Sequence, residues 1–213
     1  MATFEQGTRS SISGLVTTAR VLSILVFTGV ETAALALWLS IVEGVTVASL
    51  TATVGLGILV VGLGIEHLLT DVTVNGLNLS APVWTILGLS VSEAVLWAIW
   101  LAVAETATGL GGYVLAATVL AVLLVPQHTV EDNALRGTDP FSSILDLGTI
   151  GFSIIESVGA TIWLVLVFDP ALVIDRLPSG TLGGFDPATV GLALLALALF
   201  VEHNIAVTYS RGR

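Results

Sequence analysis

Six long apolar segments constrain this 213-residue chain more than any other feature. Each approaches the ~20 residues that an α-helix needs to cross the hydrocarbon core of a bilayer. Only 10% of the residues are charged, against about 25% in soluble domains, so the chain lacks the polar surface that water requires. The expected fold class is an all-α, multi-pass membrane protein with spans at Val21–Val42, Val47–Leu69, Val83–Ala104, Tyr113–Thr129, Ile144–Phe168 and Ala188–Val207.

The charged residues are strongly unbalanced in sign. Sixteen acidic residues accompany six arginines and no lysine, which gives a net charge of -10. This balance excludes nucleic acid as a partner, and the absence of lysine excludes a retinal Schiff base. The acidic, lysine-free composition resembles that of proteins from extreme halophiles. Cysteine is also absent, which excludes disulfides, thiolate metal sites and a cysteine nucleophile.

The arginines indicate how the chain is oriented in the cell membrane. The N-terminal stretch is polar and lacks the apolar core of a signal peptide, so the first helix is expected to insert and to stay. A short interfacial helix is expected at Pro170–Leu177, in the longest connection. Both termini are expected to be cytoplasmic by the positive-inside rule. Only Arg176 falls on the opposite side from Arg9, Arg20, Arg136, Arg211 and Arg213.

The spans carry a threefold internal repeat. In each odd span a glutamate precedes a tryptophan by seven positions, and in each even span a histidine follows an acid or amide and precedes a glycine by nine positions. All three histidines of the chain occupy this one position. The odd-span pairs are Glu31 and Trp38, Glu93 and Trp100, and Glu156 and Trp163. The even-span triplets are Glu66, His67 and Gly76; Gln127, His128 and Gly137; and Glu202, His203 and Gly212.

These fixed offsets predict three tandem two-helix units, at residues 15–76, 79–137 and 143–212, within a single transmembrane domain. Because each unit crosses the membrane twice, every copy starts from the same side. The copies are therefore expected to be related by a pseudo-threefold axis along the membrane normal.

The repeated polar residues are expected to lie at one depth. Arg20 precedes Glu31 by eleven residues, or roughly 16 Å of helix, and His203 precedes Arg211 by eight, or roughly 12 Å. The resulting layer has five carboxyl groups and no lysine or arginine. A lone charge at mid-bilayer costs ~2.5–3.5 kcal/mol on insertion scales, so these groups must be mostly protonated or neutralised by bound cations. The layer comprises Glu31, Glu66, His67, Glu93, Gln127, His128, Glu156, Glu202 and His203.

A divalent transition metal is the favoured interpretation, since imidazole and carboxylate are ligands of zinc, iron and manganese. The number of ions stays open. The expected ligands are the three histidines with Glu31, Glu93 and Glu156, while Glu66, Gln127 and Glu202 are additional or supporting ligands. Asp71 and Asp132, four residues after His67 and His128, could orient those rings.

Whether such a centre catalyses, transports or only binds stays open at this point. As an enzyme it would use a metal-activated water or oxygen on a membrane-soluble substrate such as a lipid, quinone or isoprenoid. The alternatives are a proton or cation channel or transporter, a haem or pigment protein, and Glu–His pairs that only join helices. Besides the bilayer, a second copy of the chain is an open partner.

Three further features have structural interpretations. Trp38, Trp100 and Trp163 are best explained as an aromatic belt near the membrane surface, with a lid over the polar layer as the alternative. Pro126 either kinks its helix and aims Gln127 and His128 inward, or is simply tolerated. Close helix packing is expected at Gly55, Gly57, Gly62 and Gly64.

Overall fold

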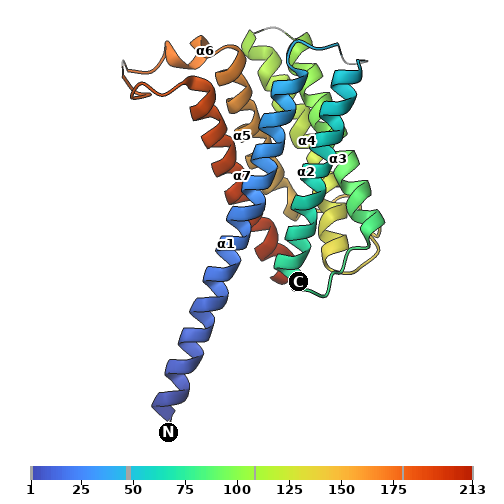
Figure 1. The fold of residues 1–213 in the computed structure, drawn as a ribbon, viewed down its shortest axis with the longest axis vertical. Coiled ribbons are helices and arrows are strands. Elements are labelled where there is room, and N and C mark those ends of the chain that lie inside the picture. Colours follow the sequence, from blue (N-terminus) through green and yellow to red (C-terminus); the bar gives the residue numbers. More distant parts are fainter. Residues whose placement is uncertain (1, 47–48, 108, 179, 213) are drawn as a thin grey trace.

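A computed structural model describes the backbone of residues 2–46, 49–107, 109–178 and 180–212, and the side chains from residue 17 onward. Within these ranges the chain is all-helical (Figure 1). A 3-10 turn, η1 (Leu147–Thr149), and a helical turn, α6 (Ala171–Ile174), flank α5. The long helices are α1 (Ala2–Val42), α2 (Leu50–Asn75), α3 (Val83–Thr106), α4 (Gly109–Leu135), α5 (Ile150–Phe168) and α7 (Pro187–Gly212).

All six long helices in the described ranges are apolar and long enough to cross a bilayer, which supports the expected multi-pass membrane protein. Several helices extend beyond the predicted spans, and α4 continues through Pro126 to Leu135. The fifth helix begins at Ile150 rather than at Ile144, because the Asp146 side chain accepts the N–H of Gly148 and starts the helical turn there. The short helix expected after α5 is present as α6.

Three positions used in the sequence predictions are not covered. Val47, the expected first residue of the second span, and Arg213 lie outside the described residues, as does the side chain of Arg9.

The long helices form a closed ring of neighbours. Each packs against the next one along the chain, and α7 packs against α1. Both termini lie at the same end of the bundle, where α1 projects beyond the other helices, while α6 lies at the opposite end (Figure 1). Arg20 of α1 donates a hydrogen bond to Thr208 of α7 at the terminal end.

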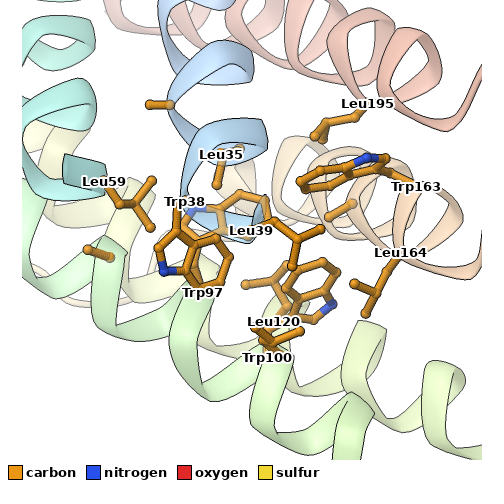
Figure 2. Close-up of a cluster of buried hydrophobic side chains, with 14 of the residues drawn as sticks. Leu35, Trp38, Leu39, Leu59, Trp97, Trp100, Leu120, Trp163, Leu164 and Leu195 are labelled. Atoms are coloured by element: carbon orange, nitrogen blue, oxygen red, sulfur yellow. The ribbon is translucent and has the colours of Figure 1, made fainter. Parts of the chain in front are cut away.

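The half of the bundle remote from the termini has a core of tryptophan and leucine (Figure 2). Trp38, Trp100 and Trp163 are at most 3% exposed, so the aromatic-belt prediction is wrong for them. Seven residues are two helical turns, and each tryptophan therefore points to the same side of its helix as the buried glutamate before it. The even helices complete this core with Leu59, Leu63, Leu120, Leu124, Leu195 and Leu199, which are fully buried four and eight residues before the histidines.

Glycine allows two of these helices to approach closely. A Cβ on Gly62 of α2 would lie 2.3 Å from the Cβ of Ala34 on α1, so the helices touch at backbone distance. A Cβ on Gly55 would likewise lie 2.8 Å from the side chain of Val42. At Gly57 and Gly64 a Cβ would fit without such a clash, so the packing role is supported at only two of the four glycines.

Asp71 holds the connection between α2 and α3 together. Its carboxylate accepts the backbone N–H groups of Ser80 and Ala81, at 3.1 and 2.9 Å, and the side-chain amide of Asn75. The expectation that Asp71 orients the ring of His67 is therefore wrong. The same correction applies to Asp132, which pairs with Arg136 and accepts the hydroxyl of Ser210. Both acids lie one helical turn nearer the end of the bundle than their histidines, and their carboxylates are used by the groups found there.

Replacing Asp71 by alanine is expected to destabilise the protein by about 1–3 kcal/mol, because buried N–H groups lose their acceptor. Thermal unfolding in detergent measures this loss, and Asp71→Asn, which keeps one acceptor oxygen, should lose less. An Asp71→Ala protein as stable as the parent would contradict this structural role.

Candidate metal centre

A small polar cavity lies between all six long helices, in the half of the bundle near the termini. We call it the acidic cavity. Its volume is about 20 Å³, which is room for about one water-sized particle. His128 and His203 contribute to its wall. Each long helix provides one of its described carboxylates: Glu31 from α1, Glu66 from α2, Glu93 from α3, Glu131 from α4, Glu156 from α5 and Glu202 from α7.

Three of these carboxylates, Glu31, Glu93 and Glu156, form a compact group that we call the carboxylate trio. One oxygen from each lies within 4.8 Å of the other two. Oε2 of Glu31 and Oε1 of Glu156 are buried without a hydrogen-bond partner. Metal–oxygen bonds of ~2.0–2.6 Å place opposite ligands about 4–5 Å apart, so the trio has the spacing of a cation's ligands.

Each histidine faces one member of the trio on the neighbouring helix. The three contacts join α2 to α3, α4 to α5, and α7 to α1, so they occupy every second interface around the six helices. All three use Nε2 of the imidazole. The distances from Nε2 to the carboxylate oxygen are 3.3 Å for His67 and Glu93, 3.1 Å for His128 and Glu156, and 3.2 Å for His203 and Glu31.

The other ring nitrogen, Nδ1, meets a hydroxyl three residues before each trio glutamate. Nδ1 of His128 lies 2.8 Å from Oγ of Ser153, which itself donates to the carbonyl of Thr149. Ser153 therefore accepts from His128, and Nδ1 carries the proton. The remaining pairs are His203 with Thr28, at 2.8 Å, and His67 with Ser90, at 3.3 Å.

His67 gives the clearest proton assignment. Its Nδ1 lies 2.7 Å from the carbonyl oxygen of Leu63, which can only accept, so Nδ1 again carries the proton. A neutral ring then has a bare lone pair at Nε2. This atom is buried without a hydrogen-bond partner and faces an oxygen of Glu93. Two lone pairs at this distance repel each other unless a proton or a cation lies between them.

A second group of three residues also has the spacing of metal ligands, and it includes His67. One ligand atom each from Glu66, His67 and Glu131 lies within 4.8 Å of the other two. Because its Nε2 also faces Glu93, His67 connects this second group to the trio. The carboxylate of Glu202 is 3.3 Å from Nε2 of His203, and the same nitrogen lies 3.8 Å from Oε1 of Glu66.

Eight of the nine residues predicted from the sequence line the acidic cavity or contact its walls; Gln127 does not. Its side chain donates to the carbonyl of Leu89 and accepts the hydroxyl of Ser92, in an apolar groove outside the bundle core. Glu131, one turn later on the same helix, lines the cavity instead. The signal for Glu131 was its spacing of three residues from His128, which places it on the same face of a helix that continues past Thr129.

The charges of the acidic cavity do not balance. Its described lining includes six carboxylates and neither lysine nor arginine. Even three fully protonated histidines would leave three negative charges, since 6 - 3 = 3. Buried charge without a partner costs several kcal/mol per ion, so extra protons or bound cations must occupy this place.

No protein-family model matches this chain, and no curated protein or solved structure matches it either. The function is therefore argued from the chemistry of the cavity alone.

Proposed function

We propose that this chain is an intramembrane metal-binding protein whose centre is the carboxylate trio backed by three histidines. The observation that supports this most is the Nε2 atom of His67, buried, unpartnered and aimed at a carboxylate. Metal-binding histidines characteristically donate Nδ1–H to a carbonyl, carboxylate or water and present Nε2 to the ion. A divalent cation between the rings and the trio would replace repulsion by coordination at each Nε2–oxygen contact.

The donor set indicates the class of metal. Carboxylate oxygen suits manganese, and imidazole suits iron and zinc. We propose up to two divalent ions of this class, one at the trio and one at Glu66, His67 and Glu131, which resembles the paired-metal sites of helical bundles. A cavity of about 20 Å³ is far too small for haem or another pigment.

We also propose that three tandem hairpins, at residues 15–76, 79–137 and 143–212, surround this centre with pseudo-threefold symmetry. Three observations support the symmetry: the matched Nε2–carboxylate contacts at every second helix interface, the hydroxyl three residues before each trio glutamate, and the buried leucines four and eight residues before each histidine. The position of Arg20, Arg136 and Arg211 at the terminal end supports cytoplasmic termini.

A through-going channel is less well supported than a binding site. The half of the bundle beyond the trio is filled by tryptophan and leucine side chains, of which Trp97 and Trp100 are fully buried. A charged particle leaving the trio in that direction would meet an apolar barrier. The centre is therefore better explained as a binding site that is closed to ions on the side of the apolar core.

Elemental analysis tests the proposal directly. Protein purified without chelators should contain at least one manganese, iron or zinc ion per chain. Chelation should lower the unfolding temperature, and adding the metal back should restore it, because a ligand at about 100 times its dissociation constant stabilises by ~2.7 kcal/mol. Ser92→Ala, which alters only the groove outside the cavity, should keep the metal. A metal-free parent that no divalent cation stabilises would leave the Glu–His pairs as helix-joining contacts.

A further inference from the structure

We infer that cations reach the acidic cavity by a single path between α2, α4 and α7, starting from a vestibule at the terminal end. The identity of the cation rests on the proposed function, whereas the path rests on how two cavities are stacked along these three helices.

The vestibule is a second cavity, of about 530 Å³. Residues near the C-terminal ends of α2, α4 and α7 line it, among them Val74, Leu135 and Ser210. Thr138 and Arg211 at its rim are exposed, so the vestibule opens to the surface at the end of the bundle that carries the C-terminus.

The two cavities share the same faces of the same helices. Thr70, Glu131 and Ala206 line the acidic cavity, and each lies three residues after a histidine. The vestibule residues Val74, Leu135 and Ser210 lie seven residues after those histidines. A step of four residues keeps the side chain on one face of a helix and advances it by ~6 Å. The vestibule therefore lies about one helical turn beyond the acidic cavity.

A polar contact joins α4 and α7 at the vestibule, where Arg136 and Ser210 line the wall. Asp132 of α4 accepts the hydroxyl of Ser210 on α7 at 2.7 Å and forms an ion pair with Arg136 at 2.6 Å. This pair neutralises a positive charge that would otherwise repel an incoming cation. Glu131, the residue before Asp132, is half-buried, while the other five cavity carboxylates are buried. Glu131 is thus the first cavity carboxylate that a cation from the vestibule meets.

Silver ion tests the path without depending on metal binding at the trio. The parent chain has no cysteine, so one introduced thiol is unique. Ala206→Cys places it in the acidic cavity, and Ile205→Cys places it at the same depth on a lipid-facing side chain that is 41% exposed. The protein is placed in vesicles with all chains inserted in one direction and exposed to Ag⁺. It is then denatured and alkylated, and a thiol that has bound Ag⁺ is protected from alkylation.

We expect Ag⁺ added at the face that bears Arg211 to reach Ala206→Cys about tenfold faster or more than Ag⁺ added at the opposite face. Ile205→Cys should react slowly from both faces. Equal rates from the two faces, or equal rates for the two thiols, would overturn the path whether or not the protein holds a metal.

A second arm measures the loading of Mn²⁺ itself. Val74→Cys, in the vestibule, is labelled with a bulky thiosulfonate. The control is Thr106→Cys with the same label, since Thr106 is exposed at the end of the bundle remote from the vestibule. Label at Val74→Cys should slow Mn²⁺ uptake about tenfold or more and leave the final content unchanged, and label at Thr106→Cys should change neither. Unslowed uptake contradicts the path. A parent that takes up no Mn²⁺, iron or zinc contradicts the proposed function, and the Ag⁺ result then decides the path alone.

Discussion

Replacing all three trio glutamates by glutamine should abolish metal binding without weakening the metal-free protein. The variant Glu31→Gln, Glu93→Gln, Glu156→Gln loses three anionic ligands. Changes to residues that merely support a ligand already cost 10–100-fold in affinity, so a loss of more than about 100-fold is expected. Metal content by elemental analysis and the metal-dependent shift in unfolding temperature measure it.

The sign of the stability change separates metal binding from helix joining. Without metal, three neighbouring carboxylates repel one another, and glutamine removes this repulsion while keeping the shape of the side chain. The metal-free variant should therefore unfold at the temperature of the metal-free parent or above it. If the Glu–His contacts only join helices, breaking them should instead cost up to about 3–5 kcal/mol per contact, because each histidine loses its charged partner.

A matched control keeps the number of removed charges the same. Glu43→Gln, Glu105→Gln, Asp175→Asn removes three exposed acids outside the acidic cavity. This control should retain its metal and its metal-dependent stabilisation. Equal loss of metal in both variants would show that net charge, rather than coordination by the trio, attracts the ion.

The recurring sequence offsets explain why most of the cavity could be predicted from the sequence. Glu31, Glu93 and Glu156 recur at one offset from tryptophan, and residues at equivalent positions of repeated helices lie at the same depth. The same offsets explain why Glu131 was missed. It departs from the pattern, since Thr70 and Ala206 occupy its position in the other units. Its carboxylate reaches the cavity because α4 stays helical through Pro126, which composition alone did not indicate.

The hydroxyl residues that contact Nδ1 of the histidines could not be predicted from the sequence. Thr28, Ser90 and Ser153 each precede a trio glutamate by three residues, and small hydroxyl residues are common in membrane helices. Their role depends on which helices are neighbours, because each of them contacts a histidine on another helix. Helix neighbours are set by packing of the whole bundle, which local spacing does not specify.

Truncation of Trp100 to alanine should cause one of the largest losses of stability in this chain. Its ring is fully buried, packs edge to face on Trp97 at 5.3 Å between centroids, and donates to Oγ1 of Thr161. Removing such a ring typically costs about 3–5 kcal/mol, since the surrounding side chains refill the space only in part. Thermal or denaturant unfolding in detergent measures the loss, and Trp100→Phe, which keeps an aromatic ring, should lose less.

The same variant tests whether the two halves of the bundle are separate in function. An apolar cavity at Trp100, walled by leucine and tryptophan, should stay dry, so Trp100→Ala should bind as much metal as the parent and leave vesicles tight to cations. An exposed tryptophan of an aromatic belt would cost little on truncation, so a change below about 1 kcal/mol would contradict the buried position. Loss of metal, or a cation leak, in a folded Trp100→Ala protein would mean that the apolar half takes part in the centre. A binding site that ions enter from the terminal end alone would then be contradicted. That arrangement requires Trp100 and its apolar neighbours to exclude water on the other side of the trio.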